Sequence, residues 1–410
     1  MKKSLFVLLL CVMCVGMSSC KKNHHPREDN KQKIQVAVDK IRKNLSDSLG
    51  ISFPSLSLLI QTRNEKIFVS SRGESGQVVT PDTYYRFASN TKNFTSTAIL
   101  NMWEDGWLDY KAKITDMIPG SKLTYVPSTA DWDFPYKEKI TIELLMQHAA
   151  GVFDVDNDPV RGYNGLSYTQ AIQKANPRHQ FTTSEMVKVL KEKNLSYFKP
   201  GEGYHYSNTG YSILAEIIKR VYTEKAGSDK TYADYMEDYL VGDYTPVPLK
   251  TIHFPVLATD IAMPDPHLIS TILTPQGPQR YDNFNMTAQI GEGNGYGTME
   301  ELNKYIRTLM RGENVLKPAT IKLMQKDVST ANPTYGLGCS YMKNIGYGHR
   351  GARLGFLNLM AYDPNYDVSV IVMIPLYDER NLPASFMTCF NSLSEAAYAA
   401  REVLGYPGKP

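Results

Sequence analysis

A serine and a lysine stand three residues apart at the start of one helical pattern, and such a pair could perform nucleophilic chemistry. In FASNTKNFTSTAIL, residues 87–100, Ser89 and Lys92 precede apolar residues at helical spacing. A serine hydroxyl is a weak nucleophile until a nearby base takes its proton, and a lysine can be that base when burial keeps it neutral. The alternative is a helix cap beside a solvated lysine, because Ser-x-x-Lys also occurs at Ser18, Ser19, Ser196 and Ser340.

A tyrosine and an asparagine form a second candidate pair, in KPGEGYHYSNTGYSILAEIIKRVY, residues 199–222. The proline and glycines at its start predict a loop, and the apolar spacing after them predicts an amphipathic helix. Tyr206 and Asn208 lie where this loop meets the helix. A tyrosine there can relay a proton, and an asparagine can orient an amide carbonyl. A packed tyrosine and an asparagine helix cap are the alternative.

The third candidate segment is YGHRGARLGF, residues 347–356, in which His349 and Arg350 precede an expected strand. Gly351 would let a substrate approach the backbone closely. The N–H of Ala352 could then join that of Ser89 in an oxyanion hole. A loop with a solvated histidine and arginine explains the same residues equally well.

Strands are expected at both ends of the chain and helices between them. We therefore predict an α/β (α+β) fold, with one antiparallel sheet built from both chain ends and flanked by helices. An α/β lobe would span about residues 33–110 and 295–405, and a mostly helical inserted lobe about residues 111–294. The expected strands lie in 55–73, a hairpin, and in 335–342, 354–362 and 368–376. The expected helices are 33–49, 93–107, 141–149, 183–194, 210–222, 232–240, 298–312, 317–327 and 384–404.

The first residues read as a targeting segment and not as part of the fold. A basic start, an apolar run and SSC predict a signal peptide over residues 1–19. MSSC followed by KKN is similar to a bacterial lipoprotein signal, which would place a lipid on Cys20. Residues 20–32 would then be a polar tether, in which His24 and His25 are a solvated linker or, alternatively, a metal ligand pair. The chain would be anchored by lipid in the bacterial cell envelope, facing the periplasm.

Net charge and cysteine content bear on nucleic-acid binding and on disulfide pairing. With a net charge of +3 and no long basic run, the chain gives no sign of nucleic-acid binding. Apart from the three cysteines near the N-terminus, Cys339 and Cys389 are the remaining ones. Whether these two pair in a disulfide is left open, as is the oligomeric state.

Six segments follow one another in an order that resembles a known family. They are YRFASNTKNFTSTAIL, TIELLMQHAAGV, KPGEGYHYSNTGYSILAEIIKRV, GYGTMEELNKYIRTL, YGLG and GHRGARLGFLNLMAYDPNYDVSVIVM. Together they resemble the serine hydrolases of the class C β-lactamase and D-alanyl-D-alanine carboxypeptidase superfamily, over about residues 51–405. The resemblance implies a two-lobed hydrolase that forms an acyl-enzyme and needs no metal or organic cofactor.

The resemblance also implies roles for particular residues. Ser89 would be the acylated nucleophile, Lys92 its base or proton relay, and Tyr206 the second proton-transfer group. Which of Lys92 and Tyr206 acts as the base is left open. Asn208 would hold the substrate amide or the Lys92 ammonium. His349 would present a positive or hydrogen-bonding edge to a substrate carboxylate.

Two departures from the family pattern bear on the substrate. The third motif is His-Arg-Gly where β-lactamases usually have Lys-Thr-Gly, so Arg350 replaces a hydroxyl and could bind a carboxylate in bidentate fashion. The loop with Asp154, Asp156 and Asp158 is a solvated acidic loop or, alternatively, a site for a substrate amine. The expected substrate is a D-amino-acid peptide, as in a D-Ala-D-Ala carboxypeptidase. A β-lactam, an ester, or a non-catalytic wall-binding role are the alternatives.

Overall fold

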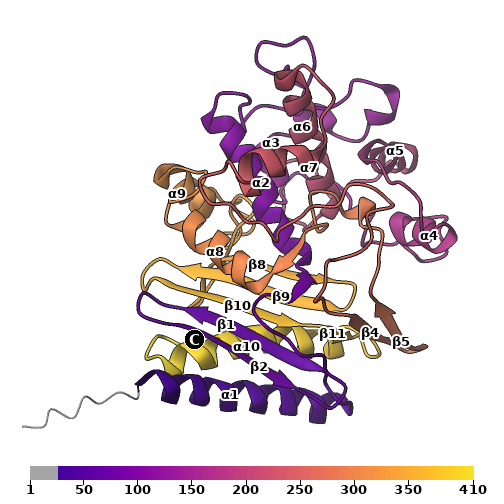
Figure 1. The fold of residues 1–410 in the computed structure, drawn as a ribbon. Coiled ribbons are helices and arrows are strands. Elements are labelled where there is room, and N and C mark those ends of the chain that lie inside the picture. Colours follow the sequence, from indigo (N-terminus) through magenta and orange to yellow (C-terminus); the bar gives the residue numbers. More distant parts are fainter. Residues whose placement is uncertain (1–25) are drawn as a thin grey trace, which may run out of the picture.

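The computed structural model describes residues 26–410, and the predicted signal peptide and Cys20 lie outside these residues. Its centre is a six-stranded antiparallel sheet with the strand order β2-β1-β10-β9-β8-β7 (Figure 1). The sheet joins both ends of the chain, which confirms the predicted fold class. Its strands are β1 Ser55–Gln61, β2 Lys66–Arg72, β7 Ser340–Met342, β8 Gly346–Arg353, β9 Phe356–Asp363 and β10 Val368–Ile374.

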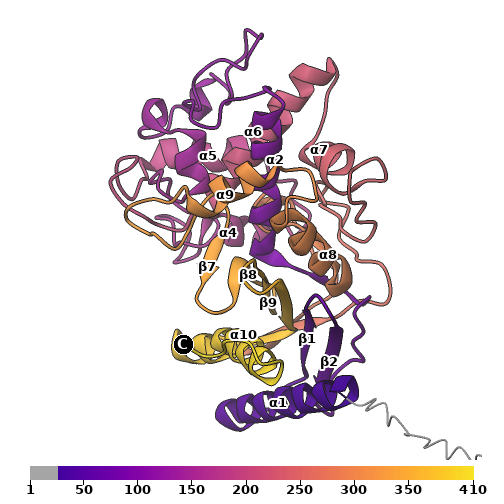
Figure 2. The ribbon, with the colours of Figure 1, turned by 90° about the vertical axis from the view of Figure 1, so that its left-hand side faces the viewer.

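Two terminal helices cover one face of this sheet, α1 (Pro26–Leu49) and α10 (Ala384–Val403) (Figures 1 and 2). All residues of β9 and β10 are buried, because helices lie on both faces of these strands. Helix α1 begins at Pro26 and not at Lys33, so part of the predicted tether is helical. Proline suits the first turn of a helix, and the Lys33–Asp29 ion pair at i,i+4 spacing supports this polar turn.

The opposite face of the sheet carries the remaining helices, with α2 at their centre (Figure 1). Almost every residue of α2 is buried, so this helix is packed on all sides and positions whatever stands at its start. Helix α8 packs on this face of the sheet against β9 and β10 (Figure 1). The helices are α2 Thr91–Glu104, α3 Ile142–Met146, α4 Tyr168–Ala175, α5 Thr183–Lys193, α6 Asn208–Ala226, α7 Tyr232–Met236, α8 Met299–Met310 and α9 Pro318–Lys326.

Several elements differ from the sequence-based prediction. The segment predicted to be mostly helical also contains a hairpin of β4 (Ser270–Thr274) and β5 (Gly277–Tyr281), which pairs with β11 (Leu376–Asp378). A further short pair joins β3 (Tyr84–Arg86) to β6 (Tyr296–Thr298). Strands β3, β6 and β11 have three residues each, which is too short for alternation to show in the sequence.

The strand predicted over 335–342 is confined to Ser340–Met342. Gly338 explains the interruption, because its φ of +66° is a left-handed backbone conformation and a Cβ there would lie 2.2 Å from Ser96 Oγ. The chain therefore turns against α2 before the strand begins.

Two further observations concern disulfide pairing and membrane-spanning helices. Cys339 and Cys389 are buried free thiols, and they belong to hydrophobic clusters on opposite faces of the sheet. Within residues 26–410, none of the helices has the length and apolar character needed to cross a membrane.

Candidate active site

Ser89 lies in a single 3-10 turn, η1 (Ala88–Asn90), between β3 and α2. The residue before it, Ala88, has a φ of +46°, a strained conformation for a residue with a Cβ. Thr91 holds this turn by donating its hydroxyl to the Ala88 carbonyl at 2.7 Å, and it accepts the Gly295 N–H at 3.1 Å. The predicted position at a helix start is therefore a rigid turn that presents Ser89 to the cleft described below.

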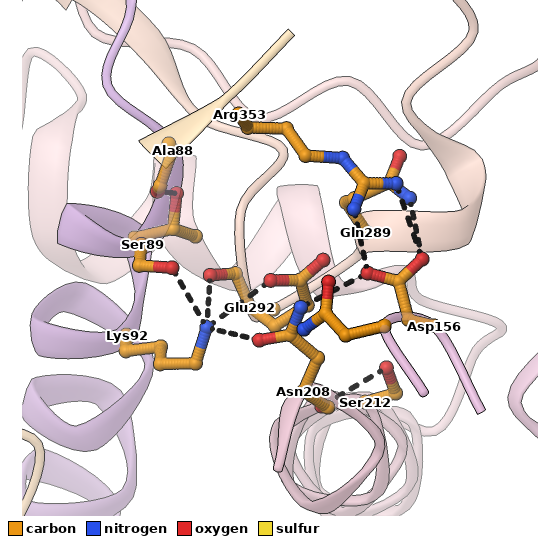
Figure 3. Close-up of polar contacts among 12 residues, drawn as sticks. Ala88, Ser89, Lys92, Asp156, Asn208, Ser212, Gln289, Glu292 and Arg353 are labelled. Carbon is orange, nitrogen blue, oxygen red and sulfur yellow. Dashed lines mark hydrogen bonds and ion pairs between the residues drawn. The ribbon is translucent and has the colours of Figure 1, made fainter. Parts of the chain in front are cut away.

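Lys92 is completely buried and its ammonium nitrogen faces four acceptors (Figure 3). The Nζ–Oγ distance to Ser89 is 3.1 Å, which lies within the 3–4 Å expected of a nucleophile and its base. Lys92 also contacts Asn208 Oδ1 at 2.8 Å, the Glu292 carbonyl at 2.8 Å and Glu292 Oε2 at 3.1 Å. An ammonium has three N–H donors, so the contact with Ser89 can become the one at which a neutral amine accepts a proton.

Tyr206 completes this group, because its hydroxyl is hydrogen-bonded to the Ser89 side chain. Lys92 Nζ lies 4.8 Å from the centre of the Tyr206 ring. Burial raises the pKa of Tyr206 well above 10, so this residue is a neutral phenol at physiological pH. The structure thus favours Tyr206 as a proton relay over a phenolate base.

Asn208 is not the helix cap considered from the sequence, because Ser207 takes that position and accepts the Gly210 N–H. The Asn208 side chain instead bridges two charged groups. Its Oδ1 accepts from Lys92, and its Nδ2 donates to Asp156 Oδ2 at 2.9 Å. Which end of the amide faces Lys92 is therefore set by Asp156.

Asp154 and Asp156 are almost completely buried, so the prediction of a solvated acidic loop was wrong for both. Asp156 accepts from Arg353 Nη1 at 2.9 Å (Figure 3) and from Thr169 at 2.6 Å. Burial alone would raise the pKa of Asp156, but Arg353 and these hydrogen bonds outweigh it and hold the pKa below the ordinary value. Because these carboxylates are saturated by protein donors, neither is available for a substrate amine.

The remaining acidic residue of that loop, Asp158, is half-buried and accepts a hydrogen bond from the Tyr197 hydroxyl. Asp154 accepts the Asn208 N–H at 3.0 Å. Burial and the charge of Asp156 raise the pKa of Asp154 to about 6. The loop thus positions the start of α6.

Glu292 was missed by the sequence analysis, although it lies at the centre of the site (Figure 3). It is 2% exposed, and its Oε1 has no hydrogen-bond partner among the described residues. Burial raises its pKa to about 8, although Lys92 lies next to it. The sequence shows only that Glu292 stands between Gly291 and Gly293, and this pattern is too common to identify a site residue.

His349 precedes β9 as predicted, but it lies inside β8, a strand that the sequence did not predict, and its surroundings correct its predicted role. Its Nε2 lies 2.9 Å from the Tyr335 hydroxyl, and its Nδ1 lies 2.6 Å from the Arg350 carbonyl. A carbonyl only accepts, so Nδ1 carries the proton and Nε2 accepts from Tyr335. Burial lowers the pKa of His349 to about 3. The ring is therefore neutral and both nitrogens are engaged, so it offers no positive edge to a carboxylate.

A second buried histidine extends this chain of hydrogen bonds. His148 Nε2 lies 3.2 Å from the same Tyr335 hydroxyl, and His148 Nδ1 accepts the Ser207 N–H at 3.1 Å. Nε2 must therefore donate to Tyr335. The chain from Ser207 to His349 joins three separate motifs with one consistent set of donors and acceptors.

The absence of a side chain at Gly351 is needed for packing inside the protein, and not only for the predicted approach of a substrate. A Cβ at this position would lie 2.6 Å from the Phe87 carbonyl oxygen and 3.1 Å from Ala88 Cβ. Strand β8 can therefore lie directly against the turn that carries Ser89. Ala352 and Ser89 both line the cleft between them, and their shared role as oxyanion donors stays a prediction.

The cleft has a volume of about 400 Å³ and opens along the edge of the sheet. Strand β7 pairs with β8 only as far as Gly348, so residues 349–353 form an edge without a neighbouring strand. No group of three or more metal-ligating side chains occurs in the part of the chain that the structure describes. The site residues that line the cleft are Ser89, Tyr206, Asn208, Glu292, Tyr335, His349, Arg350, Ala352 and Arg353.

Solved structures share this fold. The D-amino acid amidase from Ochrobactrum anthropi SV3, complexed with D-phenylalanine, superimposes with a TM-score of 0.69 at 18% identity, covering 91% of this chain and 99% of that one. The D-stereospecific amidohydrolase from a Streptomyces species gives 0.65 at 20% identity, covering 83% and 94%. The fold and the site together define a serine hydrolase of the β-lactamase and penicillin-binding-protein type.

Sequence comparison gives the family. Penicillin-binding protein 4* of Bacillus subtilis is 32% identical over 158 residues, which are 38% of this chain and 28% of that protein. Protein flp of Staphylococcus aureus is 28% identical over 217 residues, 52% of this chain and 36% of that protein. The matches thus span about a third of these relatives. The Beta-lactamase family model matches residues 40–378, so the chain belongs to this family, as the resemblance predicted.

Proposed function

We propose that this serine hydrolase forms an acyl-enzyme on Ser89 and that its preferred substrates are amides of D-amino acids in peptides. The observation that carries the mechanism is the buried Lys92 nitrogen, which lies 3.1 Å from Ser89 Oγ and is fixed from the other side by Asn208 and Glu292. A base held this rigidly needs little rearrangement to accept the serine proton.

The reaction follows from these contacts. Ser89 Oγ attacks the substrate carbonyl carbon while its proton passes to Lys92. The backbone N–H groups of Ser89 and Ala352 stabilise the negative oxygen of the tetrahedral intermediate. Tyr206, as a neutral phenol bonded to Ser89, passes a proton to the leaving nitrogen and regains one from Lys92. Water then attacks the acyl-enzyme and regenerates Ser89.

The substrate class is supported by the neighbours in fold. Two of them are described as a D-amino acid amidase and a D-stereospecific amidohydrolase. This chain aligns with 99% of the first and 94% of the second. An amide of a D-amino acid is the bond that these names share with the peptides of D-alanyl-D-alanine carboxypeptidases.

A labelling experiment tests the proposed nucleophile. The wild-type protein is treated with a reporter-tagged fluorophosphonate and compared with Ser89→Ala and Lys92→Ala. Ser340→Ala is the matched control, because Ser340 also lines the cleft and also precedes a lysine by three residues. We expect label in the wild type and in Ser340→Ala, none in Ser89→Ala and much slower labelling in Lys92→Ala. Equal labelling of Ser89→Ala, or none in the wild type, contradicts the proposal.

Side-by-side assays then rank the substrates. D-alanyl-D-alanine peptides, D-amino-acid amides, a chromogenic β-lactam and short p-nitrophenyl esters are compared by kcat/KM. The amides of D-amino acids should give the highest values. A higher value for the β-lactam or the ester would replace the proposed substrate class while leaving the Ser89 mechanism intact.

We propose that the chain is held in the cell envelope by a lipid on Cys20. The support is the signal-like sequence that ends at this cysteine, a few residues before α1 begins at Pro26. Cys20→Ala should abolish incorporation of a radiolabelled fatty acid and release the protein from the membrane fraction. Unchanged fractionation of Cys20→Ala would contradict the anchor.

A further inference from the structure

Arg350 is a cation without a charged partner at one end of the catalytic cleft. Its guanidinium lies 4.5 Å from the centre of the Phe390 ring, and no ion pair or side-chain hydrogen bond to it occurs among the described residues. The other arginine that lines the cleft, Arg353, is paired with Asp156 at 2.9 Å. Burial lowers the pKa of Arg350, which reflects the cost of holding this charge away from water.

The pleat of β8 explains how Arg350 reaches the cleft. Successive side chains of a strand point to opposite faces, so Arg350 and Ala352 face α10 while His349 and Gly351 face the Ser89 turn. Because β7 stops pairing at Gly348, this part of β8 is an edge. The cleft therefore continues around the edge from Ser89 to the α10 side of the sheet.

Helix α10 supplies an aromatic wall at this end. Phe386 and Phe390 stand at i and i+4, with ring centres 5.6 Å apart and planes inclined by 18°. Both rings are half-buried and line the cleft, together with Met342. The neighbouring Cys389 is completely buried, which fixes this turn of the helix.

Charge and shape together indicate what this end of the cleft accepts. Of the described residues that line the cleft, Glu292 is the sole acidic one, and it is paired with Lys92. Arg350 therefore has no protein anion to satisfy it, and its stacking on Phe390 holds the guanidinium in place. A ligand carboxylate can use the donor fork of a guanidinium in a bidentate contact, and apolar atoms beside it can pack on the two rings.

We infer that Arg350, Phe386 and Phe390 form a specificity subsite for a substrate group that combines an aromatic or large apolar side chain with a carboxylate. This subsite rests on the proposed function in so far as the substrate is cleaved at Ser89. The carboxylate contact predicted for both His349 and Arg350 is thus assigned to Arg350 alone.

Binding of two small probes tests this subsite on the full chain. Calorimetry measures the Kd of N-acetyl-D-phenylalanine and of N-acetyl-D-phenylalaninol, in which an uncharged alcohol that the enzyme cannot hydrolyse replaces the carboxylate. The wild type should bind the acid about 10- to 100-fold more tightly, the range for a hydrogen bond to a charged group. Arg350→Gln should bind the acid and the alcohol equally, with the Kd of the alcohol unchanged. Arg280→Gln, at an exposed position on β5, is the matched control and should keep the preference.

The outcomes separate this inference from the proposed function. Equal binding of the acid and the alcohol by the wild type, binding of neither, or a preference that survives in Arg350→Gln overturns the subsite. A loss of both probes in Arg350→Gln also overturns it, because such a loss reports misfolding of the edge. The same samples are labelled with fluorophosphonate. If the wild type is labelled at Ser89 but shows no preference for the acid, the subsite alone is refuted. If it prefers the acid but takes no label, the Ser89 mechanism alone is refuted.

Discussion

The Asp156→Asn variant should show two effects that can be measured separately, a loss of orientation in the active site and a loss of stability of the fold. Asp156 is buried and accepts from Asn208 Nδ2 at 2.9 Å, from Arg353 at 2.9 Å and from Gln289 at 3.0 Å. An asparagine at this position has one acceptor oxygen and a new NH₂ group. Where this NH₂ group faces Asn208, it cannot accept the hydrogen bond from Asn208 Nδ2. The contact that turns the Asn208 oxygen toward Lys92 is then lost.

The magnitudes follow from these contacts. Removing one partner of a buried ion pair costs about 3–5 kcal/mol, because the Arg353 charge is left uncompensated. We therefore expect the free energy of unfolding to fall by about that amount. Loss of a supporting contact one residue removed from the reacting groups typically lowers activity by about 10- to 100-fold. The second-order rate of fluorophosphonate labelling at Ser89 should fall by this factor.

Two variants make this prediction refutable. Asp156→Asn with Arg353→Gln removes the unpaired charge, so it should recover much of the stability in urea unfolding but not the labelling rate. Asp158→Asn is the control, since Asp158 lies in the same loop and contacts only Tyr197 among the hydrogen bonds above. A double variant that recovers both stability and rate would show that Asp156 matters for stability alone.

Three further predictions concern β8 and its neighbours. Gly351→Ala should slow labelling and lower stability by about 1–3 kcal/mol in urea unfolding, because the new methyl group meets the Phe87 carbonyl at 2.6 Å. Tyr335→Phe should cost a similar amount, because it leaves buried ring nitrogens of His148 and His349 without a partner. Unfolded His349 binds a proton below about pH 6.5 and the folded residue only near pH 3, so stability should rise with pH between these values. His349→Gln should reduce that slope by up to about 1.4 kcal/mol per pH unit.

Each of these has an outcome that would contradict it. Wild-type labelling by Gly351→Ala would mean that β8 can move away from the Ser89 turn without loss. Tyr341→Phe is the control for Tyr335, because Tyr341 is exposed on the neighbouring strand. An equal loss in both tyrosine variants would refute the hydrogen-bonded chain. An unchanged pH slope in His349→Gln would show that another group, such as His148, dominates acid sensitivity.

The central pair of the site could be predicted from its motif. Ser89 stands in the turn that leads directly into α2 and Lys92 in the first turn of that helix, so a spacing of three brings their side chains together. Tyr206 was identified because a loop signal and an apolar helix flank it. Strands β1, β9 and β10 could be predicted because they are long apolar runs, whereas β8, GYGHRGAR, has no apolar pattern and was missed. Each of these inferences rests on neighbours in the chain.

The residues that the prediction missed depend on neighbours in space. Asp156 looked solvated among three acids, yet its burial depends on Arg353, nearly 200 positions later in the chain. Glu292 could not be distinguished from a loop acid until its distance to Lys92 was known. His349 was assigned a positive or hydrogen-bonding edge because its type permits either, and only its contacts with Tyr335 and the Arg350 carbonyl show that both ring nitrogens are occupied.

The closing of the sheet by both ends of the chain has a consequence for when the enzyme can act. Leu58 of β1 pairs with Val372 of β10, so the sheet cannot form until almost the whole chain has been synthesised. Contacts this distant in sequence make folding slow, because a long loop must close before they form. A chain that stops before β8 would carry Ser89 and Lys92 but lack the strand edge beside them and the aromatic wall of α10. The cleft can therefore form only after β8 and α10 have joined the residues of α2.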